Sequence, residues 1–87
     1  MKEKLSVGEI VQSLSGRDKG EYLVVLSVDG NYVRIADGNK RKVSNPKWKK
    51  IKHLKKISFV SDELTEHIKS GKSLGNERIY RAIKSQK

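Results

Sequence analysis

The lysines and arginines between positions 40 and 56 are the residues of this sequence whose types most clearly suggest a chemical role. This segment contains nine basic residues and no aspartate or glutamate. The nine are Lys40, Arg41, Lys42, Lys47, Lys49, Lys50, Lys52, Lys55 and Lys56. Lysine and arginine side chains neutralise phosphates and release their counterions, so a cluster without acids favours binding to a nucleic acid. The alternative is a solvated face, which is what most runs of charge provide.

The charge of the rest of the chain favours the nucleic-acid interpretation. The 87 residues carry a net charge of +10, and residues 61–87 contribute six bases against four acids. The excess of positive charge is therefore concentrated in the segment 40–56. A positive field of this size on a small body attracts polyanions. We expect contacts mainly to phosphates, with shape recognised rather than base sequence.

Two further side chains within this segment suit contacts to a nucleic acid. Trp48 stands between two lysines, where an indole ring can stack on an unpaired base. The chain has one Trp and one Phe for a small core, so packing of Trp48 in the core or at its edge is the favoured alternative. His53 can donate hydrogen bonds to a phosphate from both ring nitrogens when protonated. Packing of His53 at a seam of the sheet is an equally good interpretation.

A second group of basic side chains lies in the first glycine-bearing loop. Gly16 and Gly20 permit positive φ or a close approach of the backbone, and we assign both to the turn itself. Arg17 and Lys19 are assigned to nucleic-acid contact, because a guanidinium can bind two phosphate oxygens at once. The acid between them, Asp18, is assigned to the turn.

Catalysis and metal binding find little support in the residue types. The chain has no Cys, which excludes thiolate zinc sites and disulfides. His53 and His67 are fourteen positions apart, which is not a metal-ligand spacing. Residues 70–73 resemble the end of a phosphate-binding loop, but the first glycine of that motif would fall on Glu66. We therefore expect no enzyme activity, no metal and no cofactor.

Three apolar runs separated by glycine-bearing loops predict the β-meander that positions these side chains. The strands are expected at residues 9–14, 21–28 and 31–37. The second strand is apolar on both faces, which indicates that both of its faces are covered. Asp29 and Gly30 predict a type I′ turn, which needs positive φ at both of its central residues.

The third predicted strand adds two candidates for ligand contact. Tyr32 and Arg34 lie on the face opposite Val33 and Ile35, because side chains alternate along a strand. After a turn at Gly38, the sequence predicts a short fourth strand at residues 40–43, then a turn at 51–54 and a closing strand at 55–59. These elements together predict a small barrel of about five strands.

The C-terminal residues predict two short helices. Ser61 or Asp62 caps the first helix, at residues 63–69, and the second is expected at 77–85. Each is too short to be stable alone in water, so both must pack on the barrel or on each other, or stay partly disordered.

Each predicted helix has apolar residues four positions apart on one face. These pairs are Leu64 with Ile68 and Ile79 with Ile83. Such a face can also dock a partner protein. A protein-interaction module of the transcription or translation machinery is therefore the alternative function.

The glycine loop and the residues after it contain a recognisable pattern. Positions 16–20, 24–25 and 29–33 read Gly-Arg-Asp-Lys-Gly, Val-Val and Asp-Gly-Asn-Tyr-Val. This pattern resembles a KOW motif, a unit of the SH3-like barrels in ribosomal proteins and transcription-elongation factors. Positions 41–43 and 52–54 are also similar to the large-subunit ribosomal proteins that have a single KOW domain.

The resemblance covers residues 7–57, and Gly20 falls at the position of the hallmark glycine of the motif. It implies a mainly β fold, with an SH3-like β-barrel of the KOW type at 1–60 and a short α-helical appendage at 61–87. It also implies RNA binding, in particular to rRNA, and association with the ribosome or translation. Ribosomal or transcription proteins are further possible partners.

The expected RNA-binding and turn residues follow from both lines of argument. The RNA-binding set is Arg17, Lys19, Arg34, Lys40, Arg41, Lys42, Lys47, Trp48, Lys49, Lys50, Lys52 and His53. The structural turn set is Gly16, Gly20, Gly30 and Gly38. No apolar run has the length that a bilayer requires, so we expect no membrane partner and a cytoplasmic location. We expect the free protein to be a monomer.

Overall fold

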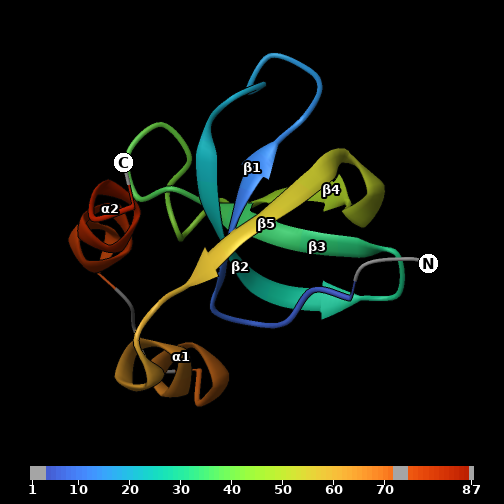
Figure 1. Ribbon diagram of the computed structural model, residues 1–87. Helices are drawn as coiled ribbons and strands as arrows, with labels where there is room; N and C mark the ends of the chain where they lie inside the picture. The colour runs from blue at the N-terminus through green and yellow to red at the C-terminus, as the bar shows by residue number, and fades with distance from the viewer. Residues whose placement is uncertain (1–3, 72–74, 87) are drawn as a thin grey trace.

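The apolar runs in the first half of the chain form strands close to their predicted positions. The computed structural model describes residues 4–71 and 75–86, as a mainly β fold with two short C-terminal helices (Figure 1). In chain order the elements are β1 (Glu9–Ser13), β2 (Tyr22–Asp29), β3 (Tyr32–Ala36), β4 (Lys47–Lys50), a 3-10 turn (Ile51–His53), β5 (Leu54–Phe59), α1 (Asp62–Lys69) and α2 (Asn76–Lys84).

The five strands form one antiparallel sheet in the order β4-β3-β2-β1-β5. The first and last strands of this order are joined by the 3-10 turn, which lies where the sequence predicts a turn. Five flat strands would place the two edges about 19 Å apart. Four residues of extended chain span at most about 14 Å, so the sheet must curl to bring β4 and β5 together. The two edge strands do not pair with each other, and closure into a barrel is not confirmed.

The predicted fourth strand at residues 40–43 is wrong. The chain here forms a loop, in which the Asp37 carboxylate accepts hydrogen bonds from the backbone N–H groups of Asn39 and Arg41. The backbone N–H of Asp37 also donates to the carbonyl of Arg41. These local bonds hold the backbone in a turn and leave it no sheet partner. The strand that pairs with β3 is β4, which follows Pro46.

The hairpin between β2 and β3 differs from the type I′ turn that the sequence predicts. Asp29 pairs with Tyr32, so the central residues of the turn are Gly30 and Asn31. Of these only Gly30 has positive φ, at +61°. This is the pattern of a type II′ turn, which needs positive φ at its first central residue alone.

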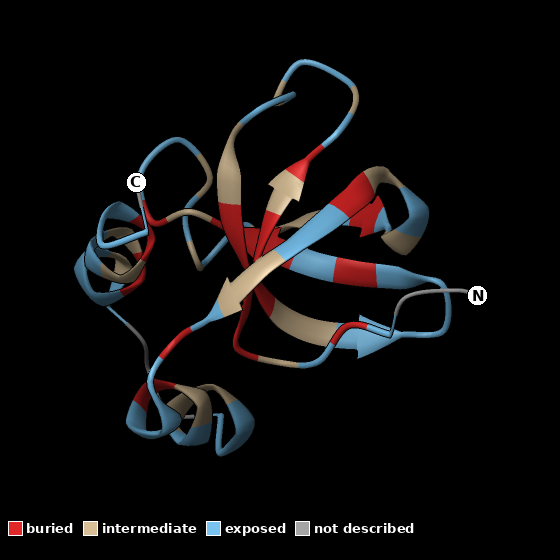
Figure 2. Cartoon of the chain, in the orientation of Figure 1, coloured by how far each residue is buried: buried red, intermediate tan, exposed pale blue. Residues whose placement is uncertain are grey.

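Two hydrophobic clusters lie on opposite sides of the sheet. Adjacent residues of one strand point to opposite faces, so Val11 enters the first cluster and Ile10 the second. The first cluster contains Leu5, Val11, Leu23, Val25, Val33, Ile35 and Leu54. The second contains Ile10, Val24, Val60, Leu64, Ile79 and Ile83. The prediction that both faces of β2 are covered is confirmed, as Figure 2 shows in the run of buried residues at its centre.

The C-terminal helices complete the second cluster. The Ser61 side chain caps α1 by accepting a hydrogen bond from the backbone N–H of Leu64 at 3.2 Å. Leu64, Ile79 and Ile83 are all buried against the sheet. The apolar faces that the sequence offers for docking a partner are therefore occupied within this chain. Neither described helix has the length and apolar character needed to cross a membrane.

Candidate nucleic-acid interface

The outer face of the β3–β4 pair gathers two aromatic and two basic side chains. In the register of this pair Tyr32 lies opposite Lys50, and Arg34 lies opposite Trp48. The alternate residues of β3, Val33 and Ile35, point inward and are fully buried. The four outward residues are all exposed, and we call them the aromatic–cationic face: Tyr32, Arg34, Trp48 and Lys50.

Each cation of this face lies over the ring of the residue opposite. The Arg34 guanidinium carbon is 4.8 Å from the centroid of the Trp48 ring. The Lys50 ammonium is 5.9 Å from the centroid of the Tyr32 ring. Such contacts contribute about 0.5–1 kcal/mol at exposed sites, which is enough to favour one orientation of each ring. The rings keep much of their surface open, since Trp48 is 46% exposed and Tyr32 is 43% exposed.

Trp48 is thus not in the core, although packing in the core or at its edge was the favoured interpretation of the sequence. The physical reason is the register of β4. Lys49 pairs with the inward-facing Val33, so Trp48 must point outward. The core is filled by aliphatic residues from other strands and needs no indole ring.

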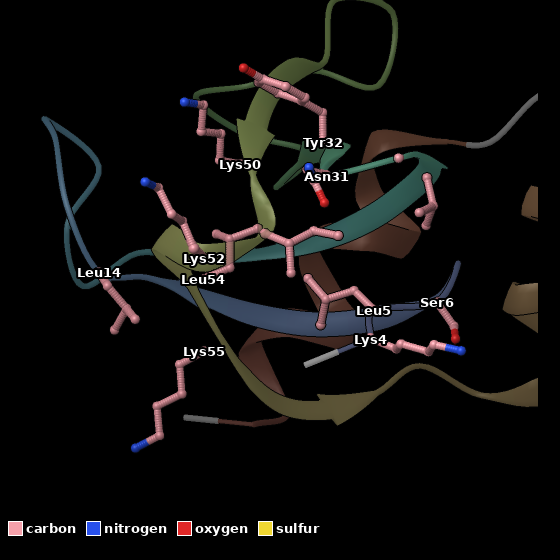
Figure 3. A pocket seen from close by; sticks show the side chains of 13 residues that line it. Lys4, Leu5, Ser6, Leu14, Asn31, Tyr32, Lys50, Lys52, Leu54 and Lys55 are labelled. Carbon is pink, nitrogen blue, oxygen red and sulfur yellow. The ribbon is translucent and has the colours of Figure 1, made fainter. Parts of the chain in front are cut away.

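A basic groove adjoins the aromatic–cationic face. It has a volume of about 1230 Å³, and its lining includes the apolar residues Leu5, Ile51 and Leu54. Four lysines also line it: Lys4, Lys50, Lys52 and Lys55. Figure 3 shows Leu5 and Leu54 in the middle of the groove, with the ammonium groups of the lysines directed away from them. Tyr32 and Lys50 belong to both the groove and the aromatic–cationic face.

Among the residues that the structure describes, those lining the groove give it a positive charge without compensating acids. No acidic side chain of this described lining is present, and none of the four lysines forms an ion pair with another described residue. Lys55 and Lys4 were not in the predicted site. Lys55 belongs to the basic run of the sequence, whereas nothing in the local sequence around Lys4 connects it with a groove formed by residues 50–55.

Lys49 has a different role from its neighbours in the sequence. Its side chain is 8% exposed, and its ammonium donates hydrogen bonds of 2.7 Å to the Ser13 hydroxyl, the Ser15 carbonyl and the Asp18 carboxylate. An ammonium has three N–H donors, so all of them are used. Because its charge is buried and already paired, Lys49 has no N–H donor left for a phosphate in this structure.

Asp18 is the acceptor that fixes the glycine loop. Lys47 binds its second carboxylate oxygen at 3.2 Å, and the Ser13 hydroxyl donates to the first at 2.8 Å. Burial raises the pKa of Asp18, but the hydrogen bonds from Lys49, Ser13 and Lys47 together outweigh burial and lower it from 3.8 to about 2. Sequence reasoning assigned Asp18 only to the turn, because its main partner is 31 positions away. Arg17 and Lys19, on either side of it, remain exposed.

The bases of the loop between β3 and β4 lie apart from the groove. Lys40 pairs with Glu21 at 3.1 Å, which raises the pKa of Lys40. Arg41 donates to the Asn45 carbonyl, and Lys42 is exposed. Figure 1 shows this loop beside α2, to which it is tied by a 2.7 Å hydrogen bond from the Val43 backbone N–H to the Asn76 side chain.

The basic segment therefore does not form one surface. Arg34, Trp48, Lys50 and Lys52 are brought together, while residues 40–42 and Lys49 are directed elsewhere. His53 is half-buried in the 3-10 turn, where its backbone carbonyl accepts from the Leu14 N–H. The turn glycines Gly16, Gly20, Gly30 and Gly38 all have positive φ.

Neither a metal site nor a known relative adds to this description of the site. The described residues contain no group of three or more His, Asp or Glu side chains placed to hold a metal ion. The sequence matches no protein-family model, and no curated protein is significantly similar to it.

Proposed function

We propose that this protein binds RNA through the basic groove and the aromatic–cationic face beside it. The observation that carries the proposal is the groove itself, where four lysines surround an apolar floor and have no acidic partner within residues 4–71 and 75–86. Bringing like charges together costs energy unless an anionic ligand offsets their repulsion. A phosphate backbone does so, and the release of its counterions supplies much of the affinity.

The residues of the site have separate roles in this proposal. Lys50, Lys52 and Lys55 contact phosphates from β4, the 3-10 turn and β5, and Lys4 does so from the N-terminal segment. Arg17 and Lys19 provide a further contact at the glycine loop. Lys49 and Asp18 make no contact with RNA and instead hold that loop against β1 and β4.

The wider assignment is part of the same proposal. The protein is a non-enzymatic member of the KOW class with an SH3-like barrel, associated with rRNA or the translation apparatus in the cytoplasm. Support comes from the KOW-like residues 16–33 and from the curled five-stranded sheet, whose last two strands are joined by a 3-10 turn. The protein-interaction alternative loses its proposed docking surface, because the helical apolar faces are buried.

The proposal is tested by the salt dependence of RNA affinity. The double variant Lys52→Gln/Lys55→Gln should flatten the slope of log affinity against log salt by about 1.4 for single-stranded RNA, at about 0.7 for each lost phosphate contact. The matched control is Lys69→Gln/Lys84→Gln, which removes the same charge from exposed positions on the two helices.

The control separates a defined site from a general attraction. We expect the helix variant to keep the slope of the wild type, because its lysines lie outside the groove. An equal change in both variants would reject the groove as the site and leave only the net charge. Absence of measurable binding to any RNA at low salt would reject the function.

A further inference from the structure

We infer that the aromatic–cationic face stacks unpaired bases, so that the ligand is a single-stranded RNA segment whose backbone continues into the groove. The inference rests on the proposed function and names the class of RNA that this site selects. Binding to phosphates alone does not distinguish a single strand from a duplex. The two exposed rings provide that distinction.

The first step is the exposure of the rings on a rigid element. Tyr32 and Trp48 lie on paired strands, and each is oriented by the cation opposite it. A base can stack on such a ring without first ordering it, and it can also stack on the planar guanidinium of Arg34. An exposed ring cannot stack in this way on a base inside a duplex, because the faces of such bases are covered by their neighbours.

The second step is the spacing of the rings. Tyr32 is two residues from Arg34 along β3, and Arg34 lies opposite Trp48, so the two aromatic residues are diagonal neighbours. Diagonal positions of an antiparallel pair are about 7–8 Å apart. Successive bases in a duplex are about 3.4 Å apart. The rings therefore suit bases that have separated from each other, as they do in an extended single strand.

The third step is the continuity of charge beside the rings. Lys50 lies over Tyr32 and also lines the groove, where it is followed by Lys52 and Lys55. Figure 3 shows the Lys50 ammonium beside the Tyr32 ring, with Lys52 and Lys55 further along the same side. A strand whose base stacks on Tyr32 thus has its next phosphates within a row of cations.

The experiment compares an unstructured oligouridylate with a blunt RNA duplex of equal length. Trp48 is the single Trp of the chain, so its fluorescence reports on this face directly. We expect the oligouridylate to quench the fluorescence in a saturable way and the duplex to leave it nearly unchanged. Trp48→Leu and Tyr32→Leu should each weaken oligouridylate binding about 5- to 150-fold, measured by anisotropy of labelled RNA, and change duplex binding less than about twofold.

Two further variants control for folding and for loss of any aromatic residue. Phe59→Leu removes a ring that is 64% exposed at the end of β5, outside both the groove and the aromatic–cationic face, and should leave both affinities unchanged. Trp48→Phe keeps an aromatic plane and should lose less affinity than Trp48→Leu. The inference would be overturned if the wild type bound both RNAs with equal affinity and without quenching of Trp48 fluorescence, and if the leucine variants lost no affinity. The proposed function would still stand after that result. Binding of neither RNA would overturn the proposed function as well.

Discussion

The Lys49 ammonium lies 2.7 Å from the Asp18 carboxylate, and this pair joins β4 to the glycine loop across 31 positions of the sequence. The Lys49 charge, which the sequence assigns to RNA contact, thus stabilises the fold. It also divides the basic segment into lysines that stabilise the fold and lysines that line the groove. The predictions below use that division.

Lys49 and Lys52 should differ in their effect on stability when each is changed to glutamine. Lys49→Gln leaves the partly buried Asp18 carboxylate without its closest partner, and should lower the free energy of unfolding by about 2 kcal/mol. Lys52→Gln changes an exposed side chain and should alter stability by less than about 0.5 kcal/mol. Urea denaturation measures both.

The same two variants should separate in RNA binding. We expect Lys52→Gln to flatten the salt dependence, and Lys49→Gln to retain the wild-type slope under conditions where it is folded. The role assigned to Lys49 is incorrect if its variant is as stable as the wild type and binds RNA with a reduced slope.

Acid should weaken the fold through Asp18. Its pKa is lower in the folded protein, about 2, than its ordinary value of 3.8. The contribution of Asp18 to stability is therefore complete above about pH 5 and is lost as the pH falls from 4 to 2, by about 1–2 kcal/mol. In the variant Asp18→Asn this part of the pH dependence should disappear. We would measure the difference in unfolding free energy between the two proteins from pH 6 to pH 2, and a constant difference would contradict the pKa assignment.

Gly38 should tolerate substitution less well than Gly30. Both have positive φ, but a Cβ at Gly38 would lie 2.1 Å from the Asn76 carbonyl oxygen at the start of α2, whereas a Cβ at Gly30 meets nothing within 4 Å. Gly30→Ala should cost about 1 kcal/mol, the strain of the conformation alone. Gly38→Ala adds a backbone clash and should cost about 2–4 kcal/mol. Equal melting temperatures for the two variants would show that α2 does not pack against this turn.

The local pattern of the sequence was sufficient to place most elements. Alternating apolar residues identified β1, β2 and β3, and the capping of α1 by Ser61 was among the expected alternatives. The main failures concern residues 40–50. The expected strand at residues 40–43 has strand-like residues, but the carboxylate of Asp37 holds its backbone in a turn. The true β4 is rich in lysine and forms because β3 offers it a partner.

The sequence by itself determined the mainly β class, the glycine turns and the excess of positive charge, because each depends on residues that are close together in the chain. Only the tertiary structure decided which charges are free. The register of β4 against β3 turned Lys49 inward to Asp18 and Trp48 outward to Arg34, and the curl of the sheet placed Lys4 in the groove that Lys52 also lines. Such outcomes follow from long-range strand pairing, which determines the face on which every side chain of a strand lies. The residues next to each position in the sequence do not predict that pairing.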